Sequence, residues 1–255
     1  MSEQKLFFWH ARGLYLGPAF GLRPHRNAVA VLCVSLDEPS GLAIDPRRPQ
    51  RGYAPFTTAL IPPNTLHHLR VAASANMAFL YVDAQSRDNA RLHEAMKTQE
   101  MRVGIGLDRE EALIRELASL RTGKSWHEVR PTLLDLLGLS DAQPRDPRIA
   151  AAVARLRACP GDTNELKDVA AQAGLSPSYF LHLFKEGTGV PYRRYRLWIR
   201  MGLALRTFRS GRSLTDAAYE AGFSSSAHFS TAFAEMFGMP PSRLPSASPF
   251  ARAHG

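Results

Sequence analysis

The 255-residue sequence contains few cysteines and no long apolar run. Its two cysteines, Cys33 and Cys159, are far apart, and neither has another cysteine or a histidine at metal-ligand spacing. They predict no disulfide framework and no zinc site, which is typical of the reducing cytosol. No run of about 18 apolar residues occurs, and the first residues lack the apolar core of a secretion signal. We therefore expect a cytoplasmic protein without a membrane partner.

Motifs of common enzymes are also absent. The sequence contains no Gly-rich phosphate loop, no HExxH, no GxSxG and no convincing pair of catalytic carboxylates. We therefore expect a protein that is not an enzyme and carries no cofactor.

Acidic residues are scarce in the C-terminal part of the chain. The whole sequence has 32 basic and 23 acidic side chains, a net charge of +9. Residues 1–144 contain 17 basic and 15 acidic side chains, whereas residues 145–255 contain 15 and 8. A basic module beside a nearly neutral one indicates an anionic partner for the basic module, commonly nucleic acid. A solvated basic surface is the alternative.

The N-terminal part has the pattern of a β domain. Residues 28–36 and 77–83 are short apolar runs rich in β-branched and aromatic types, and Pro- and Gly-containing turns flank them. This pattern predicts a small barrel or sandwich. After Asp83, apolar residues recur every three or four positions, which predicts amphipathic helices over 87–100, 108–121 and 126–139.

The C-terminal part contains an internal repeat. Leu166, Ala170 and Gly174 recur 48 residues later, and Phe180, Phe184, Gly189 and Pro191 recur 49 residues later. Each copy reads as a helix, a turn with a glycine, and a second helix that ends at a glycine shortly before a proline. This order is the helix-turn-helix plan.

The second helix of each copy has two distinct faces. Ser176 can cap the first of these helices, with Pro177 at its first position. Phe180 and Phe184 share the face that packs on the core. The opposite faces carry Ser178, Leu181, His182, Lys185 and Glu186 in the first copy, and Ser226, Ala227, Ser230, Thr231 and Ala234 in the second.

Residues 191–210 between the two copies read as one helix. Such a helix would be about 27 Å long, and it could hold two reading helices about one DNA turn apart, about 34 Å. It carries six arginines, some of which we expect to contact phosphates: Arg193, Arg194, Arg196, Arg200, Arg206 and Arg209.

Residues 145–244 resemble the DNA-binding domain of the AraC/XylS family of bacterial transcription regulators. The resemblance rests on VAAQAGLSPSYFLHLFKEGTGVPYRRY, then Arg200 and Ala204, then LTDAAYEAGFSSSAHFSTAFAEMFGMPPSRL. It implies that both units dock into successive major grooves of double-stranded DNA. By position it implies base-facing Ser178, Leu181, His182, Ser226, Ala227 and Thr231. It also implies phosphate-contacting Lys185, Arg193, Arg194 and Arg200.

The sequence departs from the family pattern in the second unit. The family often has a long basic or amide side chain where His182 and Thr231 stand, and a basic residue where Ala234 stands. A short threonine or alanine cannot make a bidentate contact with guanine. We therefore expect the second unit to read fewer bases directly and to depend on phosphate contacts and DNA shape.

The N-terminal region is similar to the cupin-like sensor domains of the same family. The similarity rests on Pro24-His25 before one β run and on ALIPPNTLHHL before another. His67 aligns with a cupin metal ligand, but Asn27 stands where a second histidine would be. At most two metal ligands remain, so we expect no metal, and a backbone-bonded structural histidine is the leading interpretation of His67. For an effector we expect His25, Tyr53 and His67 to line the site.

We therefore predict an α+β protein: a cupin-like β-barrel with flanking helices, followed by an all-α domain of two helix-turn-helix units joined by a long helix. The expected divisions are a sensor at 1–85, helices at 86–140, a linker at 141–148, the DNA-binding domain at 149–245 and a tail at 246–255. The helices at 86–140 either close this barrel or form a homodimer.

The predicted function is sequence-specific transcription regulation controlled by a small-molecule effector, with RNA polymerase as a partner if the protein is an activator. Two alternatives stay open. One is a cupin-type enzyme fused to a DNA-targeting module, and the other is a constitutive DNA-binding protein whose N-terminal domain only dimerises.

Overall fold

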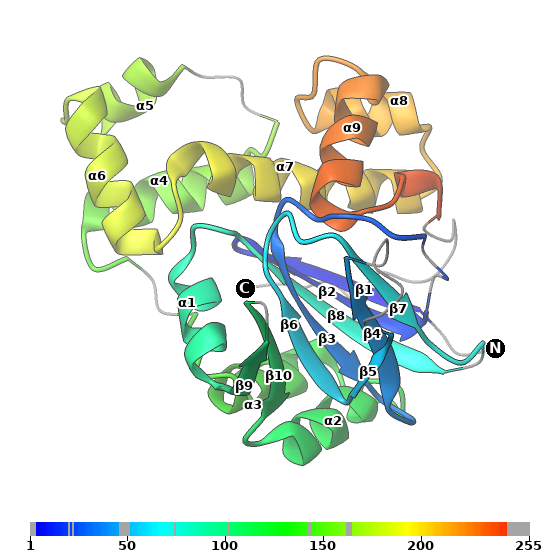
Figure 1. Cartoon of the computed structure of the whole chain (residues 1–255). Helices are drawn as coiled ribbons and strands as arrows, with labels where there is room; N and C mark the ends of the chain where they lie inside the picture. Colours follow the sequence, from blue (N-terminus) through cyan, green and yellow to red (C-terminus); the bar gives the residue numbers. More distant parts are fainter. Residues whose placement is uncertain are drawn as a thin grey trace.

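The chain folds into a β-rich N-terminal domain with flanking helices and an all-helical C-terminal domain (Figure 1). The computed structural model describes residues 4–19, 21, 23–45, 52–73, 75–100, 102–141, 144–161 and 165–243. The predicted tail at 246–255 and part of the predicted linker lie outside these residues. The α+β class predicted from the sequence is confirmed.

The N-terminal domain consists of two antiparallel sheets. The larger has the order β1-β2-β8-β3-β6-β10-β9 and the smaller the order β5-β4-β7. The strands of the larger sheet are β1 (Lys5–Trp9), β2 (Arg12–Pro18), β3 (Ala30–Ser35), β6 (Thr58–Ile61), β8 (Asn76–Val82), β9 (Met96–Glu100) and β10 (Val103–Leu107). Those of the smaller sheet are β4 (Ser40–Ile44), β5 (Ala54–Phe56) and β7 (His67–Arg70).

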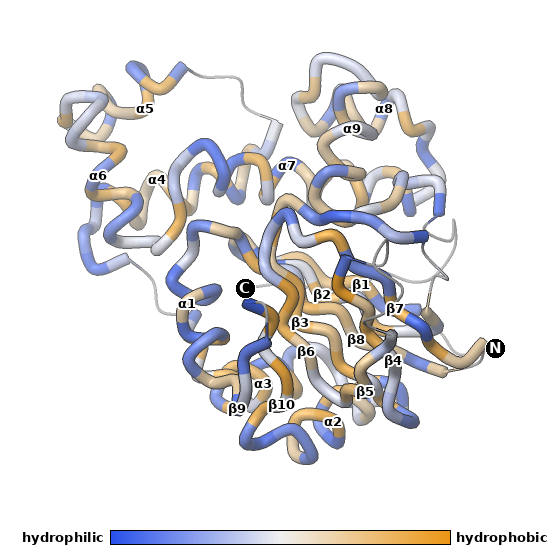
Figure 2. Tube along the Cα trace, viewed as in Figure 1, coloured by the Kyte–Doolittle hydropathy of each residue, from blue (hydrophilic) through white to orange (hydrophobic). Residues whose placement is uncertain are grey.

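The central strands of the larger sheet are buried on both faces. Every residue of β3 and of β8 is buried, which explains why both appear in the sequence as continuous apolar runs. Val31, Cys33 and Phe79 belong to one apolar cluster, and their neighbours Leu32 and Leu80 belong to another on the opposite face. Figure 2 shows the apolar residues concentrated along these inner strands.

Three helices flank this domain: α1 (Arg87–Glu94), α2 (Glu110–Ser119) and α3 (Trp126–Leu136). The apolar faces of α2 and α3 cover one face of the larger sheet, where Trp126 stacks on Phe7 with ring centroids 4.4 Å apart. These apolar faces are therefore buried within the chain itself. Of the two roles expected for these helices, packing on the sensor is the one that the structure shows.

The predicted helix over 87–100 is wrong in its second half. α1 ends at Glu94, and β9 and β10 follow as a hairpin that joins β10 to β6. The helical spacing of apolar residues ends at Ala95 and Met96, because Lys97–Glu100 are all polar, and β-branched Val103 and Ile105 can pair with the sheet edge. A Cβ atom at Gly104 would lie 2.3 Å from the Met96 side chain, so the close approach of β9 requires glycine there.

The C-terminal domain contains two helix-turn-helix units joined by a long helix. Its elements are α4 (Pro147–Ala158), α5 (Leu166–Gln172), α6 (Pro177–Thr188), α7 (Tyr192–Arg209), α8 (Leu214–Glu220), α9 (Ser226–Phe237) and a short 3-10 turn (Pro241–Arg243). The expected continuous helix between the units is confirmed as α7, which has 18 residues. Within the described part of the chain, no helix has both the length and the apolar character needed to cross a membrane.

The two domains share one apolar cluster, because α7 lies across β1 and beside the ends of β2 and β8 (Figure 1). Four aromatic residues meet there: Phe8 and Tyr81 from the sheet, Trp198 from α7, and Phe237 from α9. Phe237 packs edge-on against Tyr81, Phe8 and Trp198, with centroid distances of 4.8, 6.0 and 6.0 Å. The second helix-turn-helix unit is therefore packed directly on the sensor domain.

Gly238 fixes a second contact between the same unit and the sensor. It ends α9 with a φ of 72°, and a Cβ atom there would lie 1.9 Å from Cδ2 of His25. Beside it, the backbone N–H of Ala28 donates a hydrogen bond to the carbonyl oxygen of Glu235, at 2.6 Å. The loop at 25–28 therefore lies against the end of α9 at a distance that only glycine permits.

We predict that Gly238→Ala destabilises the protein more than Gly189→Ala does. Both glycines end a helix at a nearly equal left-handed φ, 72° and 74°, so both variants lose about 1 kcal/mol on that account. Alanine at 238 also displaces His25, for about 1–3 kcal/mol more, whereas a Cβ atom at 189 stays 3.4 Å from Arg87. Urea unfolding of the two variants measures the difference, and equal losses would contradict the close contact.

Candidate nucleic-acid interface

The second helix of each unit begins and ends with the same local structures. α6 follows Ser176, whose hydroxyl accepts a hydrogen bond from the Tyr179 N–H at 3.4 Å, and α9 follows Ser225, which caps the His228 N–H at 3.0 Å. In each unit a glycine with positive φ turns the chain before this helix, Gly174 at 64° and Gly222 at 77°. The repeat in the sequence therefore corresponds to a repeat in backbone structure.

The aromatic residues of both helices point into the core. Phe180, Phe184 and Phe229 have no exposed surface, and Phe233 is 2% exposed. Tyr192 at the start of α7 packs edge-on against both Phe180 and Phe184. These contacts fix the rotation of α6 about its own axis and so determine which side chains face outward.

The structure places all six predicted base-facing residues on the outward side of the two helices. Four of them are exposed and two are half-buried. The exposed ones are Ser178, His182, Ala227 and Thr231, and the half-buried ones are Leu181 and Ser226. Their contact with bases stays a prediction.

Two histidines near these faces have neighbours on the same helix or its cap. Nε2 of His182 lies 3.8 Å from a carboxylate oxygen of Glu186, one turn along α6. Nδ1 of His228 lies 3.0 Å from the Ser224 hydroxyl, and its ring packs edge-on against Phe223. His182 is thus directed outward on α6, whereas His228 is held at the start of α9.

The arginines of α7 are distributed over different surroundings. Arg193 is exposed, but its neighbour Arg194 binds Oδ2 of the fully buried Asp83 through Nε at 2.5 Å. The Arg196 guanidinium lies 5.7 Å from the centre of the Tyr192 ring. Arg200 is half-buried against the turn at Gly222, where an added Cβ atom would lie 2.6 Å from Nη2 of the arginine.

The predicted phosphate contact of Arg194 therefore does not fit this arrangement of the domains. The side of α7 that carries Arg194 and Trp198 faces the sensor domain, where both side chains donate hydrogen bonds to Asp83. Arg209 also lies toward the sensor: burial raises the pKa of Tyr15, and the nearby charge of Arg209 offsets part of that rise. The sequence could not show which side of α7 is covered, because arginines occur all around the helix.

The three residues expected to line an effector site take part in two separate contacts. His25 and His67 exchange two backbone hydrogen bonds of 3.0 Å, and their ring centroids are 4.4 Å apart. Tyr53 instead bonds His68, with 2.6 Å between the phenol oxygen and Nδ1. Among the described residues no three potential metal-ligating side chains of His, Cys, Asp or Glu converge.

His67 is a buried histidine bonded to backbone. It is 1% exposed, and its Nδ1 lies 2.9 Å from the carbonyl oxygen of Thr65. Burial, and then the neighbouring His25, lower the pKa of His67 to about 4. Burial also lowers the pKa of His25. Both rings are therefore neutral at pH 7, and His25 lies beside the end of α9.

A polar network beside the first unit was not predicted from the sequence. Arg12, only 5% exposed, donates to Asp88 at 2.8 Å, to Asp141 at 2.5 Å and to the Ser140 carbonyl at 2.8 Å. Nearby, Arg157 of α4 donates to Nδ1 of His10 at 2.6 Å. Burial, followed by Arg157, Arg12 and Arg130, lowers the pKa of His10 to about 3.

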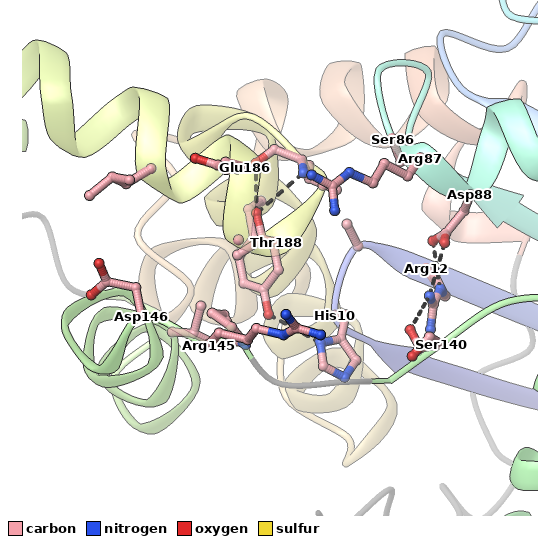
Figure 3. A pocket seen from close by; sticks show the side chains of 18 of the residues that line it. His10, Arg12, Ser86, Arg87, Asp88, Ser140, Arg145, Asp146, Glu186 and Thr188 are labelled. Carbon is pink, nitrogen blue, oxygen red and sulfur yellow. Dashed lines mark hydrogen bonds and ion pairs between the residues drawn. The ribbon is translucent and has the colours of Figure 1, made fainter.

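These residues border a pocket of about 630 Å³ between the sensor and the first helix-turn-helix unit (Figure 3). Its walls come from the β1–β2 turn, α1, α4 and the segment before it, the C-terminal half of α6, and the start of α7. No sequence signal identifies this pocket, because its lining residues are scattered between positions 10 and 195.

Comparisons with known proteins bear on the helical domain first. Residues 169–246 match the family model described as "Helix-turn-helix domain". The chain is 39% identical over 77 residues to the HTH-type transcriptional regulator GlxA of Rhizobium meliloti (strain 1021), which is 30% of this chain and 24% of that protein. The C-terminal domain is an AraC-type helix-turn-helix domain.

A second curated relative matches a stretch of similar length. The Msm operon regulatory protein of Streptococcus mutans serotype c is 31% identical over 85 residues, which is 33% of this chain and 31% of the relative. The chain thus spans about a quarter to a third of the length of these two curated relatives.

The likeness to one solved structure extends beyond the AraC-type domain. A variant of ToxT from Vibrio cholerae in its apo form has a TM-score of 0.50 at 12% identity, and the match covers 91% of this chain and 96% of that one. The two chains therefore share the two-domain fold, a β-rich N-terminal domain followed by an AraC-type domain.

We predict that Arg194→Gln destabilises the protein, whereas Arg193→Gln does not. Loss of the Arg194 guanidinium leaves the buried Asp83 carboxylate with two donors, the indole N–H of Trp198 and the backbone N–H of Gln85, but without a counter-charge, for a loss of about 1–3 kcal/mol. The adjacent exposed Arg193 should change stability by less than about 0.5 kcal/mol. Thermal unfolding of both variants measures this, and a neutral Arg194→Gln would mean that the ion pair does not form.

Proposed function

We propose that this protein is a sequence-specific, DNA-binding transcription regulator in which α6 and α9 enter successive major grooves. The single observation that carries the proposal is the pair of similarly capped helices, α6 and α9, joined by one continuous helix, α7, with four of their six predicted base-facing residues exposed. The net charge of +7 over residues 145–255 supplies the attraction to phosphates. Both curated relatives of the AraC-type domain are regulators of transcription or of an operon, which supports the same conclusion.

The two units are proposed to read DNA differently. α6 presents Leu181, His182 and Lys185, which can reach base edges and phosphates. The predicted base-facing residues of α9, Ser226, Ala227 and Thr231, are all short, and none of these can make a bidentate contact with guanine. We therefore assign direct base readout mainly to α6, and readout of DNA shape mainly to α9.

A small-molecule effector is proposed to act through the N-terminal domain. His25 and His67 lie between the small sheet and the end of α9, so a ligand that moved them would also move the second unit. Tyr53 bonds His68, which follows His67 along β7. If the protein forms a homodimer, surfaces other than the apolar faces of α2 and α3 must form the interface. If it activates transcription, it would also contact RNA polymerase.

Two other functions compete with this proposal, and each has its own test. A cupin-type enzyme with a DNA-targeting domain requires stoichiometric bound metal in the purified protein. A constitutive DNA-binding protein whose N-terminal domain only dimerises requires that no small molecule shift its thermal stability. Metal analysis and a thermal-shift screen therefore separate all three.

We predict that His182→Ala relaxes base preference in one half of the binding site. Loss of a base contact should cost about 1–3 kcal/mol on the preferred sequence and much less on others. Selection of bound duplexes from a randomised pool measures the preference. His228→Ala is the matched control, because this exposed histidine is held at the start of α9 by Ser224. A loss that is equal on all sequences would make His182 a phosphate or packing residue.

We predict that Lys185→Gln weakens DNA binding by the same factor on all sequences. Binding of the wild-type protein should decrease steeply with salt because basic side chains displace counterions. Removal of one phosphate contact should reduce the slope of log affinity against log salt by about one. Lys124→Gln, on the exposed turn between α2 and α3, is the control. A nearly flat salt dependence of the wild type would contradict the proposed docking.

A further inference from the structure

The pocket between the sensor and the first helix-turn-helix unit is built from both domains. The sensor contributes the β1–β2 turn with Ala11 and the first half of α1, and the AraC-type domain contributes Val153, the end of α6 and Tyr195. The segment at 144–146, which leads into α4, forms a third wall. Its volume of about 630 Å³ is in the range of small-molecule sites.

Two arginines of this pocket have no counter-ion. The guanidinium groups of Arg87 from α1 and Arg145 from the segment before α4 point into the pocket from opposite sides (Figure 3). Among the described residues, neither guanidinium forms an ion pair or a hydrogen bond. Both side chains are exposed to solvent, which screens their charges, and an anion placed between them would interact favourably with both.

The acidic residues around the pocket are occupied elsewhere or lie at its edge. Asp88 is bound by Arg12 at 2.8 Å, and Asp146 is bound by Arg148 at 2.7 Å. Glu186 lies 3.8 Å from His182, on the side toward the outward face of α6. These carboxylates therefore leave the charges of Arg87 and Arg145 uncompensated.

We propose that this pocket binds a small organic anion whose carboxylate or phosphate group is held between Arg87 and Arg145. Guanidinium groups bind both anions through paired hydrogen bonds. The remaining lining includes the apolar side chains of Ala11, Val153, Leu183 and Val190, which suit an apolar or mixed body on the ligand. This site is distinct from the one around His25 and His67, which adjoins the second unit.

An anion in this pocket connects three parts of the chain that border it. It contacts α1 of the sensor, the segment that leads into α4, and the C-terminal end of α6. The Arg87 side chain already lies near that end, since a Cβ atom added at Gly189 would be 3.4 Å from it. Its binding therefore restrains α6 relative to the sensor. The consequence for DNA binding rests on the proposed function, whereas the binding of the anion does not.

The test measures binding to the full-length protein by calorimetry with three probes: octanoate, glucose 6-phosphate and inorganic phosphate. Octanamide, the uncharged analogue of octanoate, shows whether the anionic group is needed. Arg87→Gln and Arg145→Gln should each lower the affinity for the probe that binds by about tenfold or more. Arg115→Gln, which removes an exposed arginine of α2 far from the pocket, should leave the affinity within about twofold.

A second variant tests the pocket without removal of a charge. Leu183→Trp fills the space between α6 and the β1–β2 turn and should abolish binding while both arginines remain, with circular dichroism as the check on folding. Preference for octanoate or for glucose 6-phosphate identifies the anion class. The proposal is overturned if no probe binds, if octanamide binds as well as octanoate, or if both arginine variants bind normally.

DNA binding of the same variants separates this inference from the proposed function. Loss of anion binding with intact binding to a selected duplex refutes neither the role of α6 nor that of α9. Absence of specific DNA binding by the wild type would refute the proposed function, and the calorimetric result would still decide the anion site.

Discussion

The arrangement of the two domains depends on one buried carboxylate. Asp83 stands directly after β8 and has no exposed surface, and the side chains that donate to its Oδ2, Trp198 and Arg194, both come from α7. A carboxylate buried without such partners costs several kcal/mol. The contact with α7 therefore stabilises the sensor domain in this form, and the two donors, one turn apart, also fix the rotation of α7.

Because α7 is continuous, this one contact positions both helix-turn-helix units. α6 is attached to the start of α7 through Tyr192, and α8 packs along its second half. A change at the sensor that shifted α7 would therefore shift both recognition helices together. Any change in the angle between them must come from the separate contacts that each unit makes with the sensor.

The helical domain could be predicted from the sequence in detail, whereas the contacts between the domains could not. The repeat, the glycines at the turns and the four core phenylalanines are local signals, and each determines a structure within a few residues of itself. Arg194 and Asp83 are 111 residues apart, and nothing in the sequence pairs them. The same reason hid the β9–β10 hairpin, whose strand character comes from pairing with β6 rather than from its own composition.

The two units are held to the sensor in different ways, and this difference follows their different side chains. The second unit is packed tightly: Phe237 lies in the shared aromatic cluster, and Gly238 touches His25. The first unit instead adjoins a pocket, and two arginines on its walls have no partner among the described residues. The predicted base-facing side chains of α9 are short, whereas α6 carries His182 and Lys185. The unit to which we assign base readout is thus the one with space beside it, and the proposed anion in that space would act on its recognition helix.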